Sequence, residues 1–178
     1  TLRRFAAPGG GLYQVAAGES AELFARAIED HDGVEPAPSS VMVEVCLRLY
    51  ELTGRDDFRR FVDETLERFG PRLSTRPLSM PFLLTSFERV LGKPRTLLIA
   101  GAELPGGQAL IAAVRAKLRP DLILAGYRGA DKEVLARVIP IVRDIPDAPR
   151  ARAYLCVDRA CGLPIDDPVE LARRLDTR

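Results

Sequence analysis

The sequence predicts a mixed fold, α+β or α/β, in which antiparallel helical hairpins pack with a small, mostly parallel β-sheet. Two observations carry this prediction. Residues 1–93 place apolar side chains at helical spacing, whereas residues 94–178 alternate short apolar runs with amphipathic segments. The chain has 178 residues, and 47% of them are hydrophobic, which suffices for a core of this size. We therefore expect a helical region over 1–93 and a small α/β region over 94–178.

Four helices are expected in the first region, each delimited by glycine or proline. The segment 40–52 is apolar almost all round, which indicates a helix buried between neighbours. The segment 56–69 is amphipathic, and Gly70-Pro71 is expected to end it. Short connections favour hairpins between the first and second helices and between the third and fourth. The expected helices cover 19–30, 40–52, 56–69 and 79–91, the last capped by Ser79, and 11–15 is either a strand or a loop.

After Pro94 the apolar runs become short and rich in β-branched residues, as in buried strands. Alternation of such strands with helices favours parallel pairing and right-handed crossovers. Pro140 restricts its segment to the edge of the sheet, because proline donates no ladder hydrogen bond. The expected strands cover 96–100, 122–125, 139–142 and 153–157, and the expected helices cover 108–118, 131–138 and 168–175.

Composition excludes several classes of protein. With 26 basic and 25 acidic residues the net charge is +1, which argues against a nucleic-acid binder. No apolar run is long enough for a membrane span. An odd number of cysteines, three, is not typical of a disulfide scaffold, and no signal peptide is recognisable. We expect a cytoplasmic protein with no cofactor, no metal site, and no nucleic-acid or membrane partner.

Three short segments carry residues with possible chemistry. His31, Asp32 and Glu35 converge on one loop, which resembles the start of a calcium loop but lacks its later ligands, so a simple helix stop is the alternative. The loop 101–107 follows a strand and opens a helix, as phosphate-binding loops do, yet it lacks the lysine and hydroxyl residue of a P-loop. An ordinary turn is the alternative there. Cys156 and Cys161 are either structural cysteines, a redox pair or part of a metal site.

Several segments together resemble the C-terminal part of a known family. They are Asp32-Gly33-Val34-Glu35-Pro36 with Ser40-Val41, Leu47-Arg48-Leu49 with Leu52-Thr53-Gly54, Pro94 to Gly101, and Ala153-Tyr154-Leu155-Cys156 with Cys161 and Pro164. Their order and spacing resemble the thioredoxin-domain proteins related to spermatogenesis-associated protein 20 and the bacterial YyaL proteins. The resemblance runs from about Gly10 to Leu175.

The resemblance implies a longer, bacterial protein with an N-terminal thioredoxin-like domain and an (α/α)6 toroid similar to N-acylglucosamine 2-epimerases. The helices here would be the last hairpins of that toroid, and the upstream domains would be their partners. A sugar-like ligand in the toroid cleft is implied as well. Where the family usually has Pro-Ser-Gly-Asn-Ser, this chain has Pro36-Ala37-Pro38-Ser39-Ser40, so Ser39 replaces an asparagine. The resulting ligand-binding candidates are His31, Asp32, Glu35 and Ser39.

The sequence thus favours a C-terminal fragment of a carbohydrate-processing protein, cut at Thr1 from a longer chain and without turnover by itself. A non-enzymatic interaction module is one alternative. A thiol redox role through Cys156 and Cys161 is another. The exposed edges of the helical layer are expected to be apolar, which predicts a homodimer in isolation.

Overall fold

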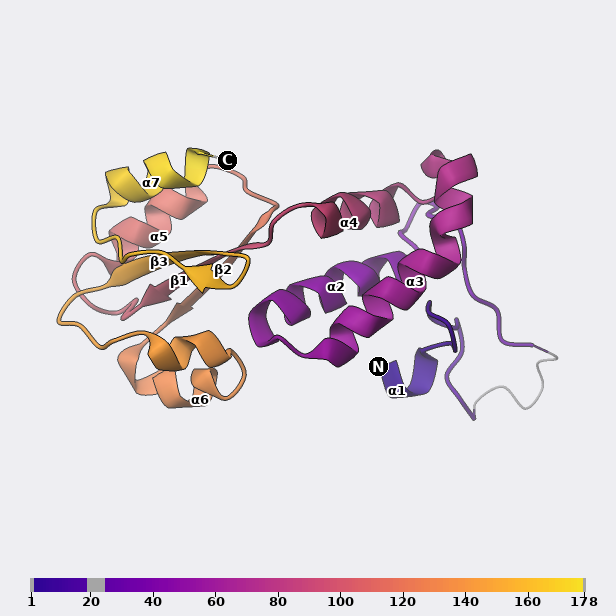
Figure 1. The fold of residues 1–178 in the computed structure, drawn as a ribbon, viewed down its shortest axis with the longest axis horizontal. Coiled ribbons are helices and arrows are strands. Elements are labelled where there is room, and N and C mark those ends of the chain that lie inside the picture. The colour runs from indigo at the N-terminus through magenta and orange to yellow at the C-terminus, as the bar shows by residue number, and fades with distance from the viewer. Residues whose placement is uncertain (1, 19–24, 178) are drawn as a thin grey trace. The chain divides into compact units, whose positions relative to one another are not determined.

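The computed structural model describes residues 2–18 and 25–177 and divides the chain into two compact units (Figure 1). We call residues 1–50 and 55–92 the helical unit, and residues 51–54 and 93–178 the sheet unit. The helices together with a four-stranded sheet confirm the α+β class. The first half of the chain contains α1 (Leu2–Phe5), α2 (Pro38–Thr53), α3 (Asp56–Thr75), the 3₁₀ turn η1 (Pro77–Ser79) and α4 (Pro81–Leu91).

The core of the helical unit is built where α2, α3 and α4 meet. The predicted helix 40–52 is confirmed as α2, and its buried residues face those of α3, which fits a helix enclosed by neighbours. Burying side chains of this size stabilises the fold by about 1.5–3 kcal/mol each. The core residues are Leu12, Val43, Cys46, Leu47, Phe61, Val62, Phe69, Met80 and Leu83.

The helix expected over 19–30 is not formed in its described part. Residues 19–24 lie outside the described residues, and 25–30 contain no helical residue. Instead Tyr13 and Ile28 form an antiparallel bridge, and the Arg26 guanidinium donates to the Val15 carbonyl at 2.9 Å. These long-range pairings replace the local bonds of a helix, so the predicted hairpin between the first two helices is wrong. The segment 11–15 contributes single bridges and no strand.

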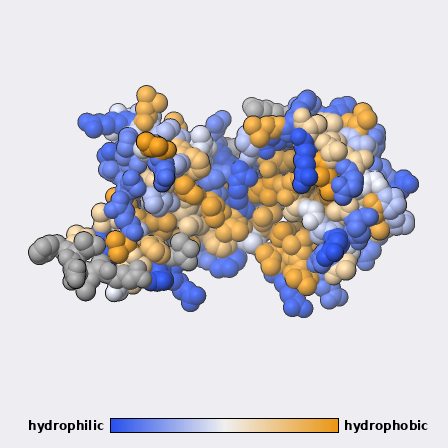
Figure 2. Space-filling view, turned by 180° about the vertical axis from the view of Figure 1, so that it is seen from behind, coloured by the Kyte–Doolittle hydropathy of each residue, from blue (hydrophilic) through white to orange (hydrophobic). Residues whose placement is uncertain are grey.

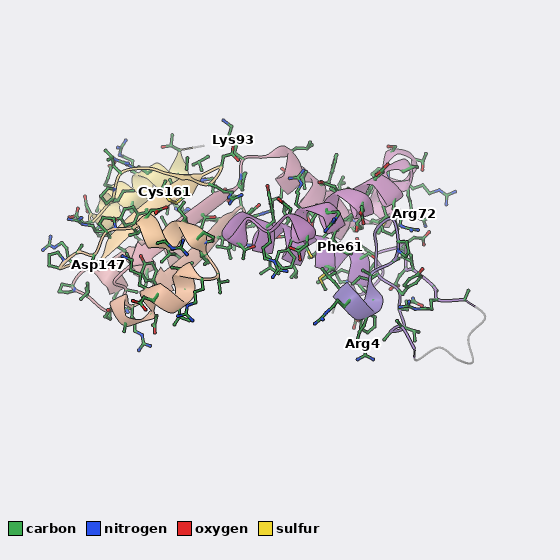
Figure 3. The ribbon with its side chains drawn as sticks, turned by 60° about the horizontal axis from the view of Figure 1, so that its bottom comes forward. Arg4, Phe61, Arg72, Lys93, Asp147 and Cys161 are labelled. Carbon is green, nitrogen blue, oxygen red and sulfur yellow. A yellow bond between two sulfur atoms is a disulfide. The ribbon has the colours of Figure 1, made fainter. Side chains whose placement is uncertain are left out.

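The helix α3 does not stop at Gly70-Pro71 as predicted but continues to Thr75. A proline inside a helix costs about 3 kcal/mol, so other contacts must offset it. Leu73 packs against the core, and Arg72 (labelled in Figure 3) forms an ion pair with Asp30 at 2.7 Å. Tertiary packing of the last turn therefore outweighs the local stop signal.

One glycine fixes how closely the chain approaches α3. Gly10 has a φ of +89°, and a Cβ there would lie 2.4 Å from the backbone of Glu64 and Thr65. This close approach lets the Gly11 N–H donate to Thr65 Oγ1 at 2.9 Å. Only glycine combines this φ with this proximity.

The sheet unit contains a mixed sheet in the order β2-β1-β3-β4. Of its three strand pairs, β1–β2 is parallel, whereas β1–β3 and β3–β4 are antiparallel, so the sheet is not mostly parallel as expected. After β2 the chain stays at the carboxyl end of that strand and enters β3 at Arg152, opposite Ala100, which makes β3 antiparallel. The elements are β1 (Arg95–Ala100), α5 (Gly107–Arg115), β2 (Leu122–Tyr127), η2 (Gly129–Asp131), α6 (Lys132–Ala136), η3 (Pro140–Asp144), β3 (Arg152–Val157), β4 (Ala160–Cys161) and α7 (Pro168–Asp176).

Helices cover both faces of this sheet (Figure 1). On one face α5 and α7 pack against Leu97 and Ile99 of β1. On the other face α6 and η3 pack against Leu98 of β1. The alternating sides of β1 thus serve two separate cores, as the two-residue period of a strand requires.

The expected edge strand over 139–142 is wrong, because this segment lies in and just before η3. Pro140 stands at the first position of that 3₁₀ helix, where its missing N–H has no cost. The expected helix over 131–138 is divided between η2 and α6. The strands predicted at 96–100, 122–125 and 153–157 and the helices at 108–118 and 168–175 are confirmed within a few residues.

Candidate functional site

Asp32 is the most highly connected of the predicted ligand-binding residues. The residue is 8% exposed, and its carboxylate accepts hydrogen bonds from the N–H groups of Ala37 at 2.8 Å, Phe82 at 2.9 Å and Leu83 at 3.4 Å. The last two donors belong to the first turn of α4, whose N–H groups have no partner within the helix. Asp32 therefore caps α4 from a loop about fifty residues away in sequence.

This arrangement corrects the expected cap of α4. Ser79 lies in η1, and its hydroxyl donates to the Arg76 carbonyl at 2.8 Å. The N-cap residue of α4 is Met80, which makes no side-chain cap bond. A capping carboxylate supplied by Asp32 replaces the local serine and adds its negative charge at the helix N-terminus.

The other three candidates divide into one buried and two exposed residues. Ser39 is fully buried, and its Oγ accepts a hydrogen bond from the Leu12 N–H at 2.9 Å. His31 and Glu35 are exposed beside the buried Asp32. Asp32 and Ser39 thus hold loops together, and a ligand role for the four residues stays a prediction.

The loop 101–107 forms a tight strand-to-helix turn. A Cβ on Gly107 would lie 2.2 Å from the Ala102 carbonyl oxygen, so glycine permits this close packing. The carboxylate of Glu103 accepts a hydrogen bond from the Gly129 N–H at 2.9 Å. These contacts account for the loop as a structural connection.

A second group of predicted residues is joined by a covalent bond. Cys156 and Cys161 form a disulfide, with their Cα atoms 3.8 Å apart. The two residues face each other across the antiparallel pair β3–β4, and Val157 and Ala160 form the adjacent pair. Cys161 lies outside the segments expected to form strands, and the structure places it in β4, a strand of only two residues.

The turn that joins β3 and β4 determines this pairing. Asp158 and Arg159 have φ values of 52° and 65°, and no other described non-glycine residue has a positive φ. Two successive positive φ values define the type I′ turn, whose twist matches an antiparallel hairpin. A two-residue turn places the residues five apart opposite each other. The five-residue spacing of the cysteines is consistent with such a hairpin, but Asp-Arg is not a typical sequence for a type I′ turn.

The two sulfur-bearing residues differ in accessibility. Cys156 is 2% exposed and belongs to the core between the sheet, α6 and η3. Cys161 is exposed on β4 (Figure 3). One end of the disulfide is therefore open to solvent and the other is fixed in the core.

The third cysteine is separate from this pair. Cys46 lies in the core of the helical unit and is 1% exposed. Burial, with a smaller effect of Asp57, raises the pKa of the Cys46 thiol to about 11. A thiol with this pKa is protonated and unreactive near neutral pH.

Residues 2–18 and 25–177 contain neither a candidate metal cluster nor a candidate membrane span. No group of three or more His, Cys, Asp and Glu residues in these ranges could hold a metal ion. No helix within them combines the length and apolar character needed to cross a membrane.

The chain is thus an α+β protein whose sheet unit presents a disulfide-bridged hairpin. It is homologous to spermatogenesis-associated protein 20. The human protein is 30% identical over 171 residues, which are 94% of this chain and 22% of the human protein. The mouse protein is 29% identical over 171 residues, covering 94% and 21%. An uncharacterised protein of Caenorhabditis elegans is 24% identical over 164 residues, covering 91% and 22%.

The chain therefore spans about a fifth of the length of these curated relatives. No family model matches the chain, and no solved structure matches it significantly. The homology confirms the resemblance to spermatogenesis-associated protein 20, while the likeness to YyaL proteins and the toroid stay predictions. These relatives are animal proteins, so they do not support the expected bacterial origin.

Proposed function

We propose that this chain is the C-terminal part of a longer thioredoxin-domain protein and that it exchanges electrons through the Cys156–Cys161 disulfide. The observation that carries the proposal is the position of this disulfide, which bridges a surface hairpin with Cys161 exposed. Its reductant would be a dithiol, and the thioredoxin-like domain implied by the family resemblance would be a source of one. The cytoplasmic setting expected from the sequence agrees, because disulfides there are mostly transient and catalytic.

The exchange follows from the different exposure of the two sulfurs. A thiolate of the partner dithiol attacks Sγ of Cys161, and the sulfur–sulfur bond to Cys156 breaks. Cys156 leaves as a thiolate and takes up a proton, while Cys161 and the partner form a mixed disulfide. The second partner thiolate then attacks its own sulfur in the mixed disulfide and releases Cys161. The partner ends as a disulfide, and the hairpin gains two electrons and two protons.

The short span of the disulfide supports a redox role more than a structural one. The cysteines are five residues apart, so the bond restricts only a small loop of the unfolded chain. Such a loop gives a stabilisation of about 2 kcal/mol, near the lower end for disulfides. Most of the stabilisation of the sheet unit comes instead from the burial of its two hydrophobic cores.

The reduction potential of the oxidised protein tests the proposal. We would equilibrate it with glutathione buffers and with a reduced thioredoxin, and measure the reduced fraction by mass after alkylation. A potential above about −300 mV and reduction by thioredoxin are expected of an exchanging disulfide. A potential below that value, or resistance to thioredoxin, would show that the bond is structural.

Two single variants form a matched pair for the direction of attack. Cys156→Ser leaves the exposed Cys161 thiol, which should form a mixed disulfide with oxidised glutathione. Cys161→Ser leaves the buried Cys156 thiol, which should react at least about tenfold more slowly. Equal rates for the two variants would contradict the assignment of Cys161 as the attacked sulfur.

A second candidate function, an interaction module, is favoured by one surface of the helical unit. The α4 residues Leu84, Phe87 and Leu91 are 38%, 37% and 73% exposed and follow one another at helical spacing. Hydrophobic side chains are visible among hydrophilic ones over both units (Figure 2). The proposed occupant of this α4 stripe is the remainder of the longer protein, since the relatives extend well beyond the matched region.

The oligomeric state tests this second candidate. We expect the isolated chain to dimerise through the α4 stripe, because its apolar side chains are exposed in the described part of the helical unit. A Leu84→Lys/Phe87→Lys variant should be monomeric in analytical ultracentrifugation, whereas a Val134→Lys control on α6 should behave as the wild type. A wild-type chain that is monomeric at all concentrations would overturn the proposal.

A further inference from the structure

A cavity of about 620 Å³ lies within the sheet unit, at the carboxyl ends of β1 and β2. The strand register explains its position, because Ala100 pairs with Tyr127 on one side and with Arg152 on the other. All three residues line the cavity. Its volume is within the range of small-molecule sites.

The topology of the sheet creates an opening at this place. The connection after β1 leads through α5 to one face of the sheet, and the connection after β2 leads through α6 to the other face (Figure 1). Adjacent parallel strands whose connections diverge in this way leave a crevice at their carboxyl ends. Ligands of open α/β sheets bind in such crevices.

The lining of the cavity is strongly basic. It includes two acidic residues, Glu133 and Asp147, against five cations, and Asp147 (Figure 3) is already paired with Lys132 at 2.9 Å. Within 2–18 and 25–177, the remaining four cationic side chains have no hydrogen-bond or ion-pair partner. The five cations are Lys132, Arg137, Arg143, Arg150 and Arg152.

Tyr127, which ends β2 and lines the cavity, carries a hydroxyl that is itself buried. Tyr127 is 5% exposed, and its hydroxyl has no hydrogen-bond partner among the described residues. The Tyr154 hydroxyl is likewise buried and without a partner among the described residues, and both tyrosines belong to the core that α6 and η3 form with the sheet. Burial, followed by Tyr154 and Asp147, raises the pKa of Tyr127 to about 12, so the hydroxyl stays a hydrogen-bond donor at neutral pH.

We propose that this cavity binds a small phosphate monoester, with unpaired arginines around the phosphate and Tyr127 in the wall beside them. Arginine suits this ligand because its planar guanidinium donates two parallel hydrogen bonds to phosphate oxygens. The cavity is larger than a phosphate ion requires, which leaves space for the esterified group. Cys156 and Cys161 do not line the cavity, so the site does not depend on the proposed redox function.

Calorimetric titration of the oxidised full chain tests the site. Inorganic phosphate, glucose 6-phosphate and glucose are the probes, the last being the uncharged counterpart. We expect both phosphates to bind, glucose 6-phosphate more tightly, with affinity that falls as salt is added. Glucose should not bind. No binding of either phosphate up to about 10 mM, or equal binding of glucose, would overturn the proposal.

Three variants separate the site from general charge effects. Arg150→Gln/Arg152→Gln should weaken glucose 6-phosphate binding at least about tenfold. Tyr127→Phe keeps the ring in the wall and removes only a buried hydroxyl, so this variant should be as stable as the wild type and bind normally. Arg3→Gln, at an exposed arginine of the helical unit, is the control and should bind normally. Equal affinity in all three variants would contradict the assigned residues.

Discussion

At the scale of single residues, Asp32 shows how one side chain can hold together two segments that are far apart in the sequence. Its carboxylate joins the loop before α2 to the first turn of α4 through three backbone N–H groups. All three donors would lose their partner if the carboxylate were removed. Buried donors without partners are among the most costly defects in a protein core.

We therefore predict that Asp32→Ala lowers the free energy of unfolding by about 2–4 kcal/mol. Asp32→Asn keeps one acceptor oxygen and should cost less. His31→Ala, at the exposed neighbour, is the control and should change stability by less than about 0.5 kcal/mol. Urea unfolding followed by circular dichroism measures all three. A loss for His31→Ala as large as that for Asp32→Ala would refute the capping role.

Cys46 gives a prediction on pH at the same scale. Burial raises the pKa of its thiol from 9.0 to about 11, so the folded chain holds this proton over a range where the unfolded chain has released it. The stabilisation is complete below about pH 9 and is lost as the pH rises toward about 11. Between these values the wild type should lose more stability than a Cys46→Ala variant, measured by urea unfolding. Parallel pH profiles would contradict this prediction.

At the scale of elements, α3 contains a proline whose destabilising effect is offset by the packing of the last helical turn. Pro71 is exposed inside the helix and offers no N–H to the preceding turn. Pro71→Ala should therefore raise the free energy of unfolding by about 1–3 kcal/mol. Pro81→Ala is the matched control, because Pro81 stands at the start of α4 where no helical bond is missing. Thermal unfolding compares the two; a destabilised Pro71→Ala would mean that the last turn of α3 needs the proline.

Some helices and strands could be predicted from the sequence pattern and others could not, and particular residues show why. The segments that became α2, β1 and β3 have a periodicity or β-branched content that acts locally. The direction of β3 was not predictable, because both faces of the sheet are covered and the strand lacks the apolar–polar alternation that is typical of an antiparallel strand. β4 has only two residues and offers no pattern at all.

The candidate sites were predicted less completely than the elements, because most of their contacts are long-range. The role of Asp32 depends on α4, which lies about fifty residues away. The cysteine pair was recognised, but the turn that joins the two residues was not. The basic cavity collects residues from Ala100 to Arg152, and only the topology of the sheet brings them together.

At the scale of the whole molecule, the two units should respond differently to reduction. The disulfide lies entirely within the sheet unit, whereas the helical unit has its own core. We predict that reduction increases hydrogen exchange in β3 and β4 and leaves α3 and the part of α2 up to Tyr50 unchanged, as measured by mass spectrometry. A Cys156→Ser/Cys161→Ser variant should match the reduced protein. Increased exchange of equal size in α3 would show that the units are coupled.

Because the three cysteines differ in burial, a thiol reagent should label them one after another in a fixed order. While the hairpin disulfide is intact, a maleimide reagent finds no accessible thiol, because Cys46 is buried. Reduction exposes Cys161 first, and a single label follows. Cys156 and Cys46 accept theirs only when the surrounding cores open. Counting labels by mass on the native protein thus reports its oxidation state and its integrity in one experiment.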